Sequence, residues 1–270
     1  TFVYKKKQFT MAKRVDLTNN SQSRTRTNKF DRLNKPTKKK SRSIWGILGR
    51  ILLLIWISTI IAVVVYKFVP VYFTPTMASR KIEAISEGIP SEIHHRWTPL
   101  SEIDRNCALA VIASEDQLFL DHNGFDFEAM STALIKNQKG KRIRGASTIS
   151  QQVAKNVFLW QDKSYIRKGL EAYFTVLIEF IWGKERILEV YLNVAETGKM
   201  TFGVEEASRR YYGHSASEVS TTEAARIAAC LPNPIVYSVK NPSAYVKKRT
   251  SFIKRQMSAL GGKKFLSNLE

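Results

Sequence analysis

An uncharged apolar run divides this chain of 270 residues into segments that must meet different surroundings. The run, ILLLIWISTIIAVVVY, covers residues 51–66 and lies between Arg50 and Lys67. Its 16 residues reach only about 24 Å as a helix, so we extend the helix to residues 44–68 to cross a hydrocarbon core of about 30 Å. The charged segment before the run is too long for a cleaved signal peptide. We therefore expect one transmembrane helix that stays attached.

The positive charge of the chain is concentrated before this run. Residues 1–43 hold 14 Lys and Arg against two Asp, whereas the remaining residues hold 29 Lys and Arg against 21 Asp and Glu. A basic flank marks the cytoplasmic side of a membrane, so the segment after the anchor is expected on the outer side. Because the excess charge belongs to the tail, it does not indicate nucleic-acid binding. We expect a basic tail over 1–43, an anchor over 44–68, a membrane-proximal linker over 69–98 and one folded domain over 99–270.

Helical periodicity dominates from about residue 100 onward, where apolar residues recur at spacings of three and four. We predict a mainly α domain with a short strand near residues 92–98 and a final basic helix over about 243–259. Residues 136–145, KNQKGKRIRG, contain five cations and two glycines. This composition predicts an exposed, mobile loop.

Histidine and cysteine do not form a metal-binding motif in this sequence. His94 and His95 have no Cys or carboxylate partner at ligand spacing, so we predict that they are surface residues. Cys107 and Cys230 lie in apolar surroundings, which favours buried, unpaired thiols over a disulfide.

The first cluster of chemically useful residues is ASEDQLFLDHNGFD, residues 113–126. Glu115 and Asp116 end an apolar helix there. They are either solvated carboxylates at a helix terminus or, beside the apolar stripe, a partly desolvated pair in which one carboxylate acts as a base. His122 fits a structural hydrogen-bonding residue better than a catalyst.

The second cluster is RGASTISQQVAKNVFLW, residues 144–160. The pattern T-x-x-Q within it matches a capping box, which begins a helix at Ser147 or Thr148. We expect free N–H groups and the positive end of the helix dipole to point outward there, ready for a phosphate. Gln152 and Lys155 would place an amide and an ammonium on adjoining surface. The alternative, a capped helix with a solvated polar face, leaves the order Gln-Gln-x-x-Lys-Asn unexplained.

The third cluster, residues 167–193, begins with RKGLEAYF. Arg167 and Lys168 stand four and three positions before Glu171, so the three residues share one helical face. On an exposed face this group is an ion pair that contributes little to stability. The apolar and aromatic neighbours of Glu171 favour a partly buried position instead.

Two carboxylates accompanied by cations favour transfer from a glycosyl diphosphate over hydrolysis of a glycoside. A glycosidase needs an acid that protonates the leaving oxygen. A diphosphate already leaves easily, so its displacement needs a base for the acceptor hydroxyl, together with cations and N–H groups for the departing charge. The three clusters supply this second set of groups.

Five segments occur in the order typical of peptidoglycan glycosyltransferases, and over about residues 90–262 the chain resembles this family. They are SEDQLFLDHNGFD, GASTISQQVAKNVFL, RKGLEAYFTVLIE, KERILEVYLN and GVEEASRRYYG. The segment CLPNPIVYSVKNPSAYVKKR, with no transpeptidase domain after it, resembles the monofunctional branch of Gram-negative bacteria. Thr197-Gly198 and Glu206-Ala207-Ser208 depart from the family's usual residues, which concerns local packing and not the chemistry.

The resemblance implies a mainly α, lysozyme-like glycosyltransferase domain preceded by one transmembrane helix. The implied location is the bacterial inner membrane, with the N-terminus in the cytoplasm and the catalytic domain in the periplasm. The implied reaction polymerises lipid II into glycan strands with inversion and releases polyprenyl pyrophosphate. Implied partners are lipid II, the growing glycan strand, the membrane and proteins of cell-wall synthesis or division, with no nucleic acid.

The resemblance also implies roles for individual residues. Glu115 is the implied base on the acceptor's 4-hydroxyl, and Glu171 is a second essential carboxylate that assists the diphosphate directly or through a divalent cation, Mg²⁺ or Mn²⁺. No other cofactor is implied. The residues implied to hold the donor's diphosphate and sugar are Ser147, Gln152, Lys155, Asn156, Arg167 and Lys168. The residues implied to shape the site are Asp116, Phe119 and His122.

Two further expectations concern the surroundings of this site. The loop at 136–145 corresponds to a mobile segment between the donor and acceptor sites of the family. The apolar residues that follow the anchor are expected at the membrane surface, where the lipid tail of the substrate lies. These residues are Val69, Val71, Tyr72 and Phe73.

Two other functions stay open. A lysozyme-like hydrolase or lytic transglycosylase that cuts the same glycan would share the fold, but it would have no use for the cations. A non-enzymatic membrane scaffold would use the basic tail to hold anionic lipid or a partner.

Overall fold

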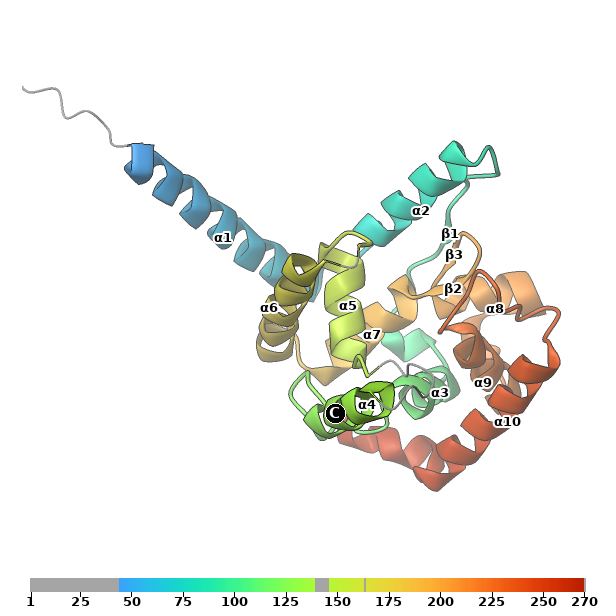
Figure 1. Cartoon of the computed structure of the whole chain (residues 1–270). Helices are drawn as coiled ribbons and strands as arrows, with labels where there is room; N and C mark the ends of the chain where they lie inside the picture. The colour runs from blue at the N-terminus through green and yellow to red at the C-terminus, as the bar shows by residue number, and fades with distance from the viewer. Residues whose placement is uncertain (1–43, 139–145, 163, 270) are drawn as a thin grey trace, which may run out of the picture. The chain divides into compact units, whose positions relative to one another are not determined.

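The computed structural model describes residues 44–138, 146–162 and 164–269 (Figure 1). The chain divides into two compact units, Thr1–Leu52 and Leu53–Glu270, and the folded domain lies in the second. The described residues form ten α-helices, three short 3-10 helices and one small sheet. The α-helices are α1 Ile44–Phe68, α2 Pro75–Ser86, α3 Arg105–Glu115, α4 Phe127–Gln138, α5 Ile149–Phe158, α6 Tyr165–Ile181, α7 Lys184–Val194, α8 Val204–Tyr212, α9 Thr221–Cys230 and α10 Ala244–Ala259. The prediction of a mainly α domain is confirmed.

Helix α1 is long and apolar enough to cross a membrane, with a mean hydropathy of 2.5 in its most apolar window. Its C-terminal end belongs to the folded domain. The indole Nε1 of Trp182 donates to the carbonyl oxygen of Val63 at 2.7 Å, and the guanidinium of Arg186 donates to that of Tyr66. The part before Val63, residues 44–62, is about 28 Å long, close to the ~30 Å of a hydrocarbon core.

The segment that follows the anchor is not the linker that we predicted over 69–98. It contains α2, which begins after Thr74, whose hydroxyl accepts the N–H of Met77. Val71 and Met77 are fully buried, so this segment is part of the domain. The expectation that Val71 lies at a membrane surface is therefore wrong. Val69, Tyr72 and Phe73 are exposed.

The core of the domain surrounds α3. This helix is buried from Cys107 to Ala113 because Ala, Val, Leu and Ile occupy every side of it. It packs against α9 and α10, while α5 packs against α6 and α7. Both cysteines are buried and unpaired, as predicted, and burial raises the pKa of Cys107 to about 12 and that of Cys230 to about 11.

A small sheet lies beside α2 (Figure 1). Its strands are β1 His94–His95, β2 Glu196–Gly198 and β3 Thr201–Phe202, in the order β1-β3-β2, with β1 parallel and β2 antiparallel to β3. The strand expected near 92–98 is thus present, and its two histidines are half-buried and not at the surface. Gly203, at φ 82°, follows β3, and a Cβ atom there would lie 2.7 Å from the carbonyl oxygen of Asn193.

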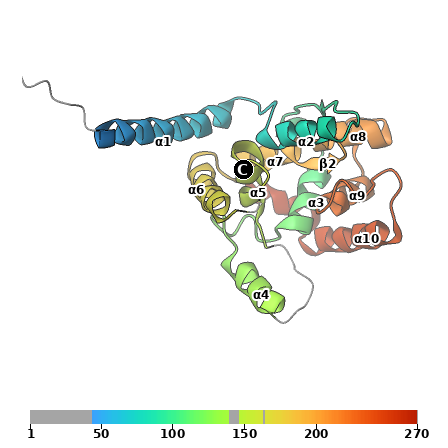
Figure 2. The same ribbon diagram turned by 45° about the horizontal axis from the view of Figure 1, so that its top comes forward.

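Helix α4 stands away from the other helices of the domain, as Figure 2 shows. Residues 136–138 of the predicted loop complete this helix, and residues 139–145 lie outside the described residues. The predicted final basic helix corresponds to α10.

Candidate active site

Glu115 is the last residue of α3, and its carboxylate is held by Ser114 of the same helix and by one residue each from α5 and α10. Oε2 accepts a hydrogen bond from Nε2 of Gln152 at 3.3 Å. Oε1 accepts from the hydroxyl of Ser114 at 2.9 Å and from the guanidinium of Arg249 at 3.4 Å. The side chain is only 14% exposed. Of the two alternatives for this helix end, the structure favours the partly desolvated carboxylate.

The remaining face of Glu115 lines a cavity of about 320 Å³. The end of α3, one side of α4 and the residues before α5 form its walls. Ser147 lies in this cavity together with Glu115, although we grouped it with the residues of the donor's diphosphate. The cavity is open to solvent and polar, so a hydroxyl group of a substrate can reach the carboxylate.

Asp116, next to Glu115, is fully engaged by the protein. Its Oδ1 lies 2.9 Å from Nε2 of His122, and its Oδ2 accepts the N–H of Ile149 at 2.9 Å. The N–H of Gly124 donates to Nδ1 of His122, so the two ring nitrogens contact Gly124 and Asp116. Phe119 is fully buried beside it. These residues position the loop after α3, and the side chain of Asp116, only 2% exposed, is less accessible to a substrate than that of Glu115.

The start of α5 is not the outward anion site that we expected. The capping box is present, because Thr148 accepts the N–H of Gln151 and the side chain of Gln151 accepts the N–H of Thr148. The N–H of Ile149 is taken by Asp116. Thr148 is 2% exposed. The protein therefore uses these N–H groups itself, and a phosphate cannot reach them.

A second polar cavity, of about 190 Å³, lies on the other side of Gln152. Lys155 and Asn156 line it, as does Tyr191, whose hydroxyl donates to Oε1 of Gln152 at 3.1 Å. Lys155 has no ion pair within the described residues. Burial lowers the pKa of Lys155, while Glu171 opposes this shift. An ammonium without a counter-ion in a polar cavity is suited to an anionic ligand.

Glu171 lies on α6, which packs against α5, and it is only 3% exposed. Its Oε2 accepts from the guanidinium of Arg167 at 2.6 Å, and its Oε1 pairs with the ammonium of Lys168. The predicted common face is therefore present, but the carboxylate is buried. A divalent cation does not fit this arrangement, because both oxygens already hold a cationic side chain.

Three residues of this region escaped the sequence analysis. Arg249 stands in a Lys-Lys-Arg run of α10, the predicted final basic helix. Tyr191 was assigned no role, and Arg80 of α2 lines the second cavity from the segment taken as a linker. Tyr191 and Arg249 both lie inside segments that resemble the family, and this position was the available signal.

A mainly helical domain that follows an apolar helix in the sequence, with one carboxylate at an open cavity and another beside two cations, is the arrangement expected of a group-transfer enzyme with a membrane anchor. Residues 80–258 match the family model described as transglycosylase, and the chain belongs to this family. The predicted resemblance and the lysozyme-like fold are confirmed.

Curated relatives support the assignment across most of the chain. A protein of Pasteurella multocida is 53% identical over 210 residues, which are 77% of this chain and 85% of the relative. Proteins of Chromohalobacter salexigens and Pseudomonas entomophila are 51% and 50% identical, over 78% and 83% of this chain and 90% and 94% of the relatives. Each relative is named biosynthetic peptidoglycan transglycosylase.

Proposed function

We propose that the protein polymerises lipid II into peptidoglycan glycan strands, with inversion at the anomeric carbon and release of polyprenyl pyrophosphate. The family and the names of the relatives support this activity. The observation that carries it is the position of Gln152, which bonds Glu115 of the first cavity and lines the second cavity with Lys155. Glu115, the proposed base, and Lys155, an ammonium without an ion pair in the described part of the chain, thus lie on opposite sides of Gln152.

In the proposed reaction, Glu115 takes the proton of the acceptor's 4-hydroxyl. The hydroxyl oxygen then forms a bond to the anomeric carbon of the donor, and the bond between that carbon and the diphosphate oxygen breaks with its electron pair on the diphosphate. Ser114, Gln152 and Arg249 hold the carboxylate in one orientation. Orientation of a base within hydrogen-bond reach is the larger part of such catalysis.

The departing charge is stabilised by cations on α5 and α6. Lys155 faces the second cavity, and Arg167 and Lys168 lie near enough to influence its pKa. Glu171 holds these two side chains in place, so we assign it a positioning role. Because its oxygens are engaged, no step of this mechanism uses a metal ion bound to Glu171.

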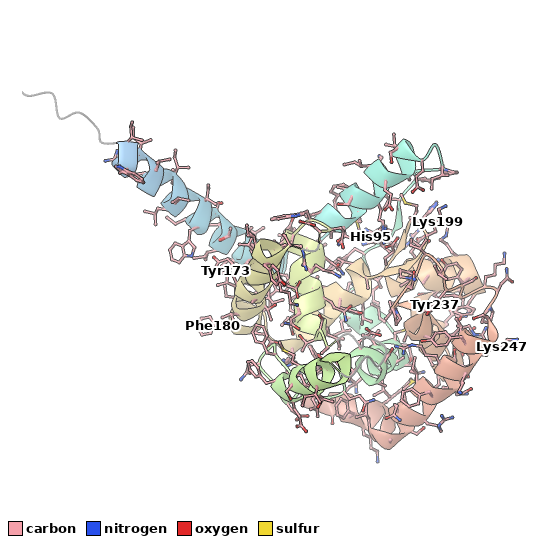
Figure 3. The ribbon with its side chains drawn as sticks, viewed as in Figure 1. His95, Tyr173, Phe180, Lys199, Tyr237 and Lys247 are labelled. Atoms are coloured by element: carbon pink, nitrogen blue, oxygen red, sulfur yellow. The ribbon has the colours of Figure 1, made fainter. Side chains whose placement is uncertain are left out.

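The membrane setting follows from the substrate and the exposed apolar residues. Lipid II keeps its polyprenyl chain in the bilayer, and we place α1 in the inner membrane with the basic tail in the cytoplasm and the domain in the periplasm. Phe180 on α6 is 89% exposed and points away from the domain, as Figure 3 shows. Ile166 and Val176 of the same helix are also exposed. These residues suit contact with the membrane surface. We propose no nucleic-acid partner, and proteins of cell-wall synthesis or division remain proposed partners.

Two substrates distinguish polymerisation from cleavage of the same glycan. Full-length protein in detergent micelles is given lipid II and, separately, finished glycan strands. We expect consumption of lipid II and growth of glycan chains, with finished strands untouched. Consumption of the finished glycan alone would identify a hydrolase or lytic transglycosylase.

Matched variants distinguish the enzyme from a scaffold. Glu115→Gln and Glu171→Gln remove one charge each with little change of shape, whereas Glu102→Gln does so on an exposed residue outside both cavities. We expect a loss of polymerisation of at least about 100-fold for the first two and none for the control. A scaffold would keep its cellular function in all three variants.

A further inference from the structure

The wall of the second cavity contains a pair of residues that the proposed mechanism does not use. Nε of Arg80, on α2, donates to Oε2 of Glu196, on β2, at 2.9 Å. Both residues line the 190 Å³ cavity that contains Lys155. They also line a neighbouring cavity of about 130 Å³, together with Lys199. Figure 3 shows Lys199 beside α2, at the hairpin between β2 and β3.

Glu196 has a buried oxygen without a hydrogen-bond donor. Its side chain is 8% exposed, and Oε1 has no partner within the described residues. The N–H of Met200 is near enough to favour the ionised carboxylate but does not meet the geometry of a hydrogen bond. Burial raises the pKa of Glu196, and Arg80 opposes this shift. A buried carboxylate oxygen without a donor is unfavourable, and a ligand with an O–H or N–H group would supply the missing donor.

Arg80 fixes the orientation of this carboxylate. Its Nη1 donates to Glu83 at 2.8 Å, so the guanidinium is held between Glu83 and Glu196 and cannot move freely. Arg80 also lies near enough to Lys155 to lower the pKa of that ammonium, after burial. Arg80, Glu196 and Lys155 thus line one cavity.

The charges decide which part of a glycosyl diphosphate lies at each end. On the α2 side the guanidinium of Arg80 is already paired with Glu83 and Glu196, so this group carries one excess negative charge. On the α5 side Lys155, which has no ion pair among the described residues, is a cation that attracts a phosphate. A sugar ring is uncharged and carries hydroxyl groups that can donate to a carboxylate. Leu231 and Pro232 add apolar surface to the same cavity.

We propose that Glu196 is a specificity residue that accepts a hydrogen bond from a hydroxyl group of the donor's sugar, with Arg80 as its positioning residue. The inference rests on the proposed function, since it names a contact to the same donor. It also gives α2 a role in the site, because Arg80 comes from the segment between the anchor and the rest of the domain.

The test compares two measurements on full-length variants in detergent micelles, the KM for lipid II and the inhibition of polymerisation by inorganic pyrophosphate. Glu196→Ala should raise KM about 10- to 100-fold, as expected for loss of a hydrogen bond to a charged group, with kcat changed less than threefold. Inhibition by pyrophosphate, which carries no sugar, should stay within twofold. Lys155→Ala should weaken that inhibition.

Glu102→Gln is the matched control, because it removes a carboxylate that is exposed, does not contact Arg80 and lines none of these cavities. We expect neither measurement to change in it. Arg80→Ala should resemble Glu196→Ala, and Arg80→Lys should recover part of the lost affinity. Glu196→Gln tests the contact if Glu196→Ala fails to fold, since its amide oxygen still accepts and the rise of KM should be smaller.

Three outcomes would overturn the inference. They are an unchanged KM in Glu196→Ala, an equal weakening of pyrophosphate inhibition in that variant, and the same rise of KM in Glu102→Gln. Wild-type protein that does not polymerise lipid II would contradict the proposed function itself. Active wild-type protein with unaltered Glu196 variants would contradict only the present inference.

Discussion

The backbone N–H of Ile149 donates a hydrogen bond to Oδ2 of Asp116 at 2.9 Å. This bond fastens the start of α5 to the end of α3, two segments 33 residues apart in the sequence. Glu115 precedes Asp116, and Gln152 lies one helical turn beyond Ile149. The bond therefore brings the base of the first cavity next to the residue that borders the second.

Asp116→Ala should destabilise the protein strongly. The change leaves the N–H of Ile149 and Nε2 of His122 buried without an acceptor, at about 1–3 kcal/mol for each group. We expect the free energy of unfolding to fall by about 2–5 kcal/mol, measured by urea denaturation in detergent. Asp121→Ala, an exposed neighbour, is the control and should change it by less than about 0.5 kcal/mol. A stable Asp116→Ala variant would show that the bond between α3 and α5 is dispensable.

Arg249→Ala should lower the rate of polymerisation without unfolding the domain. The guanidinium donates to Ser114 at 2.9 Å and to Glu115 at 3.4 Å, so its removal leaves the base free to turn. We expect kcat at saturating lipid II to fall about tenfold, with partial recovery in Arg249→Lys. Lys248→Ala removes the same charge from the exposed neighbour and should have no effect. An equal fall of kcat in Arg249→Ala and Lys248→Ala would mean that activity depends on the total charge of α10 and not on the contact between Arg249 and Glu115.

The ammonium of Lys155 should limit activity at alkaline pH. Burial holds the pKa of Lys155 below its usual 10.5, so the side chain is charged below this lowered pKa and neutral above it. Donor binding should therefore weaken as the pH rises through it, and kcat/KM should fall. Lys155→Arg should move this alkaline limb to higher pH, because a guanidinium keeps its proton. An alkaline limb at the same pH in the variant would contradict this assignment.

Lys155→Ala should affect turnover far more than folding. The side chain is half-buried and makes no ion pair within the described residues. Its removal therefore relieves the desolvation of the ammonium and leaves no group without an ion-pair partner. We expect the free energy of unfolding to change by less than about 1 kcal/mol while polymerisation falls at least tenfold. A large drop in melting temperature with normal activity of the folded molecules would contradict this.

Removal of divalent cations should leave polymerisation within about twofold of its normal rate. Both oxygens of Glu171 hold cationic side chains, so a metal ion would have to displace Arg167 or Lys168 from this carboxylate. The assay is the rate of lipid II consumption with and without a chelator. A loss of activity that added Mg²⁺ or Mn²⁺ restores in wild-type protein would contradict this prediction.

The sequence alone predicted the features that depend on neighbouring residues, within one helical turn or one uninterrupted apolar run. The apolar run between Arg50 and Lys67 predicted a helix long and apolar enough to cross a membrane, and α1 is such a helix. The capping box at Thr148 and the common face of Arg167, Lys168 and Glu171 follow from helix geometry, and both are present. The order of the family segments then indicated the chemistry.

Only the tertiary structure decided which groups meet. Arg249 reaches Glu115 across 134 residues, and Arg80 reaches Glu196 across 116. No local spacing predicts such pairs, because they depend on how whole helices pack. For the same reason the sequence did not predict that the N-terminus of α5 is unavailable to a phosphate. Asp116, which follows α3, accepts the N–H of Ile149 there. Local backbone geometry determines the elements, whereas packing over long sequence distances determines which polar groups are left for a substrate.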